Sequence, residues 1–519
     1  MKAATKLKKV LMKRTLFLSM FLFITISACA EEPVNVSSDV DKAERSIVAV
    51  QALPESIPSL DAPQVLTLDE CIDIAINNNL PLKTAKKNVK VAEWRLFETR
   101  RNLLPKVTVD IQEYGGKIYG RHFVGKKRSV ELNQTFFHGG EFFYTMKQAE
   151  TNLKVSSREY SRIKNELLLQ VKKGYYTLVK AKKNMEYQDE LSRNVSRIHD
   201  MVSKQFEAGI ASNLEFLNVS SQAYQIKFQL TSARGDEEVA SLILKQAMNI
   251  DARESIDIEP PPEFKKVDVE FEKILADALV YRPEMQISTL MVAYYNYGLK
   301  VAKSKSWPKI DGMASFGMAK EEFISKDASY DPVTGADSDQ KMEQQWYAGV
   351  KCSLPVWGST MEYTYTKEVW VPVVSSLRGT ETITNDWKFN FLDNLAQFSE
   401  KATAEVDLER AKQELIKTKQ DVELEVKEGC FSYEKALLQL DTAASKVKYQ
   451  ESDLEVTKFR REMDEVADSN VIDSMIKLAQ EKFGYVQALS DCNVAVASIS
   501  KAVGVPNYFN GVVEKNDKN

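Results

Sequence analysis

Histidine and carboxylate side chains are the residues of this 519-residue chain that could support catalysis or bind a metal. The three histidines, His122, His138 and His199, are far apart, and none lies in an HExxH motif or at a zinc-ligand spacing. The sequence contains no glycine-rich phosphate loop and no GxSxG nucleophile motif. We therefore predict that the protein is not an enzyme and holds no cofactor or metal.

Carboxylates gather at one place, the segment 463–473, where a long helical pattern has to turn. This cluster comprises Asp464, Glu465, Asp468 and Asp473. Elsewhere, acidic residues alternate with lysines along helical faces, which is typical of exposed coiled-coil positions. Two interpretations of the cluster remain open. It is either a solvated acidic turn or, if several chains converge on one axis, a ring of like charges that favours cations.

The segment 207–218 occupies the equivalent place in an earlier helical turn. Gly209 lies where one helical pattern gives way to the next, and the neighbouring Ala211 and Ser212 are small. Small side chains allow a partner helix to approach closely. We predict that Gly209, Ala211 and Ser212 contact such a partner.

These turns belong to a unit that occurs twice in the chain. Pro81 and Pro105 of the first copy match Pro283 and Pro308 of the second, about 200 residues later. Long self-similarity of this kind indicates one supersecondary unit used twice. The second copy has about 16 extra residues between its two strands. It also has about 36 extra residues after Gly358, and their alternation over 359–394 predicts an additional β-hairpin.

Each copy is predicted to contain two strands. In the segments 106–112 and 129–137, apolar side chains alternate with polar ones such as Asp110 and Glu131. In the last strand of the second copy, Lys351 is one of the polar residues of the same alternation. Strands of this length can cross a bilayer when tilted, and the alternation is typical of transmembrane β-strands. For any one strand alone, an ordinary hairpin with one solvated face would explain the pattern equally well.

Four strands cannot close a barrel, and a membrane requires closure because every backbone group must be paired. Three chains would supply twelve strands. Two chains would supply eight, whose interior would be filled with side chains, and this fits poorly with Asp110, Glu131 and Lys351 pointing inward. Heptad repeats over 141–205 and 440–454 predict long coiled-coil helices. The predicted fold is therefore α+β: a twelve-stranded outer-membrane barrel continuous with a long helical barrel.

The N-terminus resembles an export signal over 1–28, with basic residues followed by a short apolar stretch. Two cleavage sites fit: after Ala30, or before Cys29, which would then be lipidated as in a bacterial lipobox. Removing the six basic residues of the signal takes the net charge from −4 to −10, which argues against nucleic acid as a partner. Residues 29–64 have little periodicity and are predicted to be extended.

The motifs "LTLDECIDIAINNNLPL", "LLPKVTV", "RPEM", "WPKI" and "FEAGIASNLEFLN" resemble those of the TolC-like outer-membrane efflux proteins. The resemblance covers residues 65–505 and implies a homotrimeric duct in the outer-membrane lipid. It also implies a periplasmic adaptor protein and an inner-membrane transporter of the RND, ABC or MFS type. The resulting domains are a first repeat over 65–250, a linker over 251–270, a second repeat over 271–505 with its insert, and a tail over 506–519.

The resemblance also implies a periplasmic gate formed by two acidic positions three residues apart. Here these positions are Asn470 and Asp473, so only one carboxylate is present, and Asp468 or Asp464 is a candidate to replace the other. Two alternative functions remain open: a duct for protein secretion, and a periplasmic coiled-coil scaffold or adaptor.

Overall fold

The computed structural model describes residues 65–118, 121–259, 264–323, 330–331, 336–337, 341–371, 379–463 and 465–509. The chain divides into two units, Met1–Ile57 and Pro58–Asn519, and all described residues belong to the second unit. The predicted signal segment, Cys29, the extended segment 29–64 and Asp464 lie outside the described residues.

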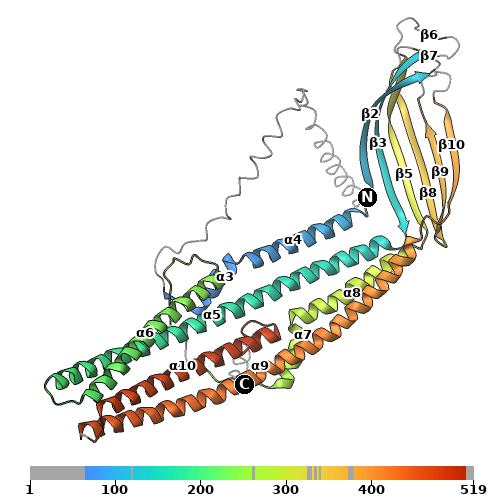
Figure 1. Cartoon of the computed structure of the whole chain (residues 1–519). Coiled ribbons are helices and arrows are strands. Elements are labelled where there is room, and N and C mark those ends of the chain that lie inside the picture. The colour runs from blue at the N-terminus through green and yellow to red at the C-terminus, as the bar shows by residue number, and fades with distance from the viewer. Residues whose placement is uncertain are drawn as a thin grey trace, which may run out of the picture. The chain divides into compact units, whose positions relative to one another are not determined.

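The helices of the second unit repeat in the same order and with the same lengths (Figure 1). The first copy has α3 (Leu68–Asn78), α4 (Leu80–Arg101), α5 (Glu141–Glu207) and α6 (Asn213–Met248). Its helices contain 11, 22, 67 and 36 residues. The second copy has α7 (Phe271–Tyr281), α8 (Pro283–Ser304), α9 (Ala396–Glu462) and α10 (Asp468–Val503), with the same four lengths. The duplicated architecture predicted from the two proline pairs is therefore confirmed.

Local sequence sets the boundaries of the short helices. Thr67 and Glu70 form a reciprocal capping box that begins α3. The predicted break near Pro81 lies at Asn79, whose side-chain oxygen accepts a hydrogen bond from the Leu82 N–H at 2.8 Å. Proline then occupies the first turn of α4, where its missing N–H costs nothing, and Pro283 has the same role in α8.

The strands form one six-stranded antiparallel sheet in the order β10-β9-β8-β5-β3-β2. The four predicted strands are β2 (Lys106–Ile118), β3 (Arg121–His138), β5 (Lys309–Phe323) and β8 (Glu343–Val356). The predicted hairpin in the insert forms β9 (Ser359–Val369) and β10 (Glu381–Asn390), which pair with β8 and extend the same sheet. The number of strands per chain is thus six, where the sequence predicted four plus a hairpin of unassigned position.

Two short pairings complete the described strands. β1 (Val65–Leu66) pairs in parallel with β4 (Asp257–Ile258), which ties the start of the first repeat to the end of its last helix. β6 (Tyr330–Asp331) pairs with β7 (Ala336–Asp337) between β5 and β8.

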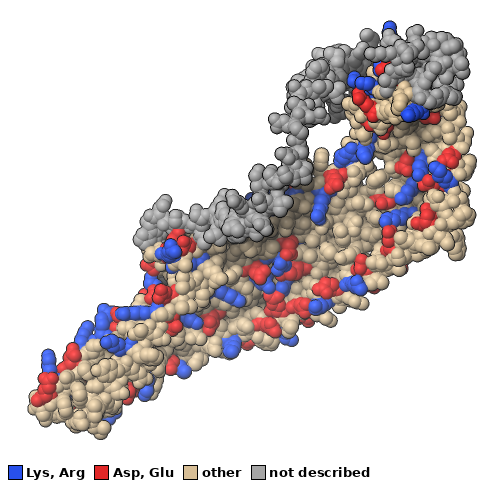
Figure 2. Space-filling model, turned by 45° about the horizontal axis from the view of Figure 1, so that its top comes forward, with Lys and Arg blue, Asp and Glu red and all other residues tan. Residues whose placement is uncertain are grey.

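Apolar side chains form three clusters along the helices. One packs α3 against α5 and α6 around Tyr175 and Leu244, and a second packs α7 against α9 and α10 around Tyr433 and Ile499. The third lies near the helix ends and joins α5 and α6 to α10 around Ile472. The two copies therefore share a core, although none of the described helices is long and apolar enough to cross a membrane. Figure 2 shows acidic and basic side chains interspersed along the helices of the visible face, without a patch of a single sign.

An ion cluster around the buried Arg282 joins the start of α8 to α9 and α10. Arg282, which is 5% exposed, donates hydrogen bonds to Glu284 and Glu425, and Lys501 donates to Glu425 at 2.6 Å. Burial acts to raise the pKa of Glu425, but the hydrogen bonds from Lys501 and Arg282 outweigh it and hold that pKa below its ordinary value.

We predict that Glu425→Gln destabilises the helical part by about 1 kcal/mol at neutral pH, because solvent screens the partly exposed carboxylate and Arg282 keeps its bond to Glu284. The lowered pKa of Glu425 means that its contribution is present above the ordinary value of 4.5 and is lost as the pH falls through the folded value. Unfolding followed by circular dichroism in detergent should therefore show a difference between variant and parent that shrinks in acid. Glu428→Gln, an exposed position on the same helix, is the control. A constant difference at all pH values would contradict the assignment.

Candidate functional site

The sheet has one apolar face that is exposed to its surroundings. Val107, Val109 and Ile111 of β2 are 56%, 61% and 69% exposed. Val107 and Val109 lie opposite Leu132 and Val130 of β3, so both strands place their apolar side chains on the same face. Phe316 of β5 continues this face through its pairing with Val130. An exposed apolar face of this extent marks contact with a membrane or a partner.

The opposite face of the sheet is polar and charged. Asp110, Lys127 and Glu131 form a chain of ion pairs across β2 and β3, with N–O distances of 3.7 and 3.8 Å. Lys351 on the same face of β8 pairs with Glu362 of β9 at 2.9 Å. The structure therefore gathers Asp110, Glu131 and Lys351 on one face, as the alternation predicts. A sheet that is apolar on one side and polar on the other, with its apolar side uncovered, has the surface chemistry of a barrel wall around water.

The first helix tip, at 207–213, is built around a left-handed glycine. Gly209 has φ +75°, which favours glycine, and no atom lies within 4 Å of the place where a Cβ would be. The N–H groups of Ile210 and Ala211 then close the turn onto the Gln205 carbonyl, and the Ser212 hydroxyl caps α6 by accepting from the Glu215 N–H at 3.1 Å. Ser212 thus has a structural role in addition to the predicted contact.

Two apolar side chains at this tip point away from the core. Ile210 is 77% exposed and Leu214 is 80% exposed, whereas Ala211 is half-buried and packs against the cluster around Ile472. The sequence pattern predicted contacts from the small residues Gly209, Ala211 and Ser212 but did not indicate Ile210 and Leu214. The missed signal was the occurrence of two large apolar residues at a turn, where solvated loops are normally polar.

The second tip corrects the prediction for Asp468. This carboxylate is only 4% exposed, and it accepts two hydrogen bonds from the Arg461 guanidinium at 2.7 and 2.8 Å. It is also the first residue of α10, where a negative charge is favourable at a helix N-terminus. Asp468 therefore holds the tip turn together, and in this chain it does not present a free charge to an axis.

Asn470 and Asp473 are both exposed and lie one turn apart on α10, so they share a face of this helix. Asp473 accepts a hydrogen bond from the Gln222 side chain of α6 at 2.8 Å, which links the tips of the two repeats. These two residues remain the candidates for the predicted gate. Since Asp468 is paired with Arg461, Asp473 is the described candidate whose carboxylate could charge such a gate.

The remaining reactive side chains are dispersed. His199 lies 3.2 Å from the Ser220 hydroxyl on the first helix pair, while His122 and His138 lie at the two ends of β3. Burial raises the pKa of Cys71 to about 12 and that of Cys492 to about 11, so both thiols stay protonated. Within the described ranges, no group of three or more His, Cys, Asp or Glu side chains is placed to hold a metal.

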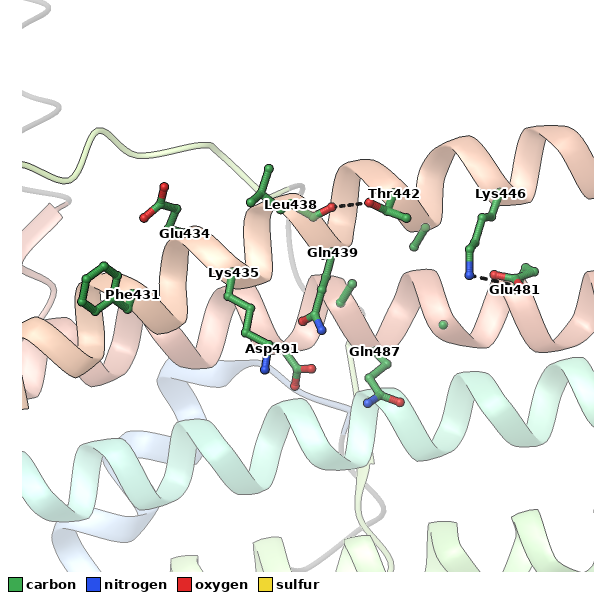
Figure 3. Close-up of a pocket in the computed structure, with 13 residues that line it drawn as sticks. Phe431, Glu434, Lys435, Leu438, Gln439, Thr442, Lys446, Glu481, Gln487 and Asp491 are labelled. Carbon is green, nitrogen blue, oxygen red and sulfur yellow. Dashed lines mark hydrogen bonds and ion pairs between the residues drawn. The ribbon is translucent and has the colours of Figure 1, made fainter.

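A groove of about 810 Å³ runs between α9 and α10 (Figure 3). Phe431 and Leu438 lie on its α9 side, and Lys446 bridges to Glu481 at 3.8 Å near one end. Gly484 lines the α10 side and has no atom within 4 Å of its Cβ position, so the groove is open at this point.

Exposed apolar residues recur every seven positions on the same long helix. Leu424, Phe431 and Leu438 form one such row on α9, and Tyr449 and Val456 form another that continues to Met463, the C-cap of the helix. On α6, Leu217, Tyr224 and Phe228 are exposed in steps of seven and four. Spacing of this kind is the pattern of a coiled-coil seam, and within one described chain these seams lack a partner helix.

An uncovered barrel-wall sheet, continued by long helices with open coiled-coil seams, defines a protomer of a membrane channel with a helical duct. The family model of the outer membrane efflux proteins matches residues 71–249, which span most of the first repeat. The first repeat thus matches this family, as the sequence motifs indicated, and the whole chain has the fold of TolC-like outer membrane channels. It is located in the outer membrane, with its helical part in the periplasm.

Solved structures share this fold at low sequence identity. The chain is similar to the Campylobacter jejuni CmeC outer membrane channel, with a TM-score of 0.68 and 14% identity over 95% of this chain and 98% of that one. It is also similar to the Vibrio cholerae outer membrane protein VceC, with a TM-score of 0.65 and 11% identity over 85% and 96%. The Neisseria gonorrhoeae MtrE channel in its open state gives 0.62 and 14% over 93% and 98%. The comparison with curated proteins found no match.

We predict that Asp473→Asn weakens divalent-cation block of single channels in planar bilayers. Two charges about 4 Å apart interact by about 1 kcal/mol in water, so we expect about five-fold weaker block when the charge is removed. Asp236→Asn removes the same charge from an exposed position of α6 away from the tip and should leave the block unchanged. Equal block in both variants and the parent would show that the acidic cluster is only a solvated turn.

Proposed function

We propose that three copies of this chain assemble into a passive exit duct, which carries substrates from the periplasm across the outer membrane. The observation that carries the proposal is the sheet, whose apolar face is exposed and whose two edge strands, β2 and β10, lack a neighbour on one side within the described chain. A bilayer tolerates strands only in a closed barrel, and the six strands of one chain are too few for closure.

The helices support the same assembly. The groove between α9 and α10 is lined by Phe431 and Leu438, and the row of exposed apolar residues on α6 is complementary to it, since a seam of apolar side chains requires a facing groove. A second copy is the occupant we assign to this groove. Adjacent copies would then enclose a helical barrel beneath the sheet, with Asn470 and Asp473 at its narrow end.

The duct is proposed to act with two further proteins. The family resemblance supports a periplasmic adaptor that docks at the helix tips, where Gly209, Ala211, Ile210 and Leu214 offer a small and apolar surface. It also supports an inner-membrane transporter of the RND, ABC or MFS type, which supplies the energy. Small toxic compounds are the proposed cargo, and protein secretion through the same duct is the second candidate, because the transporter selects what enters.

The first test is the mass of the assembly. Protein extracted from outer membranes in mild detergent should have the mass of a trimer, measured by native mass spectrometry or light scattering with the detergent subtracted. Two copies would supply twelve strands, which is enough to close a barrel. The mass of a dimer would therefore overturn the proposed trimer. Recovery as a soluble periplasmic monomer would overturn the duct and favour the scaffold.

The second test addresses the tips. We predict that Ala211→Trp, or Gly209→Trp, impairs export while the amount of trimer stays the same, because the tip is remote from the sheet. Export is measured as sensitivity of cells to a transported toxic compound, and trimer as the band on native gels. Ser203→Trp, on α5 before the tip, is the comparison for bulk alone. Unchanged export in all the tip variants would move adaptor docking to another surface.

A further inference from the structure

The hairpin β9–β10 begins at a tight turn at the lower end of β8. Trp357 and Gly358 both have positive φ, at 50° and 75°, which is the conformation of a two-residue type I′ hairpin turn. The ends of the hairpin then return to one point: the Asn394 N–H donates to the Gly358 carbonyl at 3.0 Å, just before α9 begins. The hairpin is thus inserted into a connection whose two ends stay adjacent.

β9 covers the edge of β8 along its length. The register runs without a shift from Val356–Ser359 to Trp346–Val369, and β10 follows β9 from Thr360–Asn390 to Val369–Glu381. The two strands contain 11 and 10 residues, which suits strands that cross a bilayer at a tilt. Any neighbouring chain that paired directly with β8 would have to displace these hydrogen bonds.

The apolar face of the sheet continues across the hairpin in phase. Residues directly opposite in an antiparallel pair lie on the same face. Starting from the apolar side chains of β8, the register therefore assigns to this face Met361, Tyr363, Tyr365 and Val369 of β9, and Ile383, Trp387 and Phe389 of β10. Tyr363 and Trp387 contact each other with ring centroids 4.5 Å apart, at the end near the helices where an aromatic girdle is expected.

Three polar residues, Lys367, Glu381 and Asn385, also lie on this apolar face. Each lies near the end of the hairpin or has a side-chain partner on the same face. Lys367 pairs with Glu381 at 2.8 Å near the end of the hairpin far from the helices, where a barrel wall would reach the aqueous phase. Asn385 lies further in, and its side-chain oxygen accepts a hydrogen bond from the Tyr363 hydroxyl at 2.9 Å.

The polar face continues with equal regularity. The register assigns to it Thr360, Glu362, Thr364, Thr366 and Glu368 of β9, and Thr382, Thr384, Asp386, Lys388 and Asn390 of β10. The ion pair of Glu362 with Lys351 joins the hairpin to the charged face of β8. A hairpin lying outside the barrel wall would have no reason to keep both alternations in step with four other strands.

We propose that β9 and β10 are wall strands, so that each copy contributes six strands and the trimer closes an eighteen-stranded barrel in which β10 pairs with β2 of the next copy. This inference rests on the proposed trimer. It replaces the twelve strands predicted from the sequence. Barrel diameter grows roughly linearly with strand number, so the membrane pore would be about half as wide again, within the range of strand numbers that leaves an open aqueous channel. The exit would then admit bulky hydrated cargo, and the helix tips would be the selective constriction.

Disulfide cross-linking between copies tests the neighbour of β2. In a Cys352→Ser background, cysteines are placed on the apolar face at Val107, Val109 or Ile111 of β2, and combined with cysteines at Ile383, Asn385 or Trp387 of β10. A matched series combines the same β2 positions with Ala348→Cys or Val350→Cys of β8. Outer membranes are oxidised, and cross-linked dimers and trimers are counted on non-reducing gels. We expect cross-links with β10 and none with β8.

A deletion supplies the positive control for the β8 series. Replacing residues 359–393 by one glycine copies the Gly139–Gly140 connection of the first repeat and frees the edge of β8, so β2–β8 cross-links should now appear. A second variant, Tyr363→Cys with native Cys352, places two thiols directly opposite each other in β8 and β9. Its trimer should form equally with this disulfide oxidised or reduced.

The outcomes separate the two proposals. Three results would each overturn the eighteen-stranded wall while leaving the trimeric duct in place. They are trimers with β2–β8 cross-links in the undeleted chain, trimers with neither cross-link, and loss of trimer when the Tyr363→Cys variant is oxidised so that β9 is locked to β8. β2–β10 cross-links in an assembly with the mass of a dimer would overturn the trimer and keep the six-stranded contribution.

Discussion

The structure depends on the requirement that every backbone N–H and C=O in a bilayer has a partner. A sheet with the edges β2 and β10 cannot meet this requirement alone, and the proposed assembly of several copies would supply the missing partners. The same incompleteness appears in the helices, where Leu424, Phe431 and Leu438 line a seam without a partner in the described chain. Membrane closure and helical packing therefore favour the same assembly, and the ion cluster around Arg282 joins α8, α9 and α10 within each copy.

Much of this architecture could be predicted because its causes are local. The capping box at Thr67 and Glu70, the prolines Pro81 and Pro283, and the period-two alternation around Val109 each act within a few residues. Because these local signals occur in both copies, the duplication could be predicted from the sequence. The extra hairpin was also predicted, since its alternation is visible in the sequence.

The unpredicted features arise from side-chain contacts that helix and strand periodicity does not specify. The burial of Asp468 depends on Arg461, which reaches it across the tip turn, and the partner of Asp473 is Gln222 in the other repeat. The periodicity of a sequence does not predict which of several nearby carboxylates will pair with a given arginine. The place of the hairpin in the sheet is a similar case, because alternation sets which side chains share a face but leaves open which edge the strands join.

The position of the insert follows from the topology of the duplicated sheet. Equivalent turns follow β3, at Gly139–Gly140, and β8, at Trp357–Gly358, and both have positive φ at two successive residues. β3 is paired on both sides, with β2 and β5, so a hairpin inserted after it would have to break one of these pairings. A Cβ at Gly139 would also lie 2.5 Å from the Ser304 carbonyl oxygen, which shows how closely that turn is packed. In a sheet without the hairpin, β8 would pair with β5 on one side and have no neighbour from the same chain on the other. A hairpin can therefore be added beside β8 while the pairing of β2, β3, β5 and β8 and the start of α9 stay intact. Of the two turns, only the second could enlarge the wall without rebuilding it.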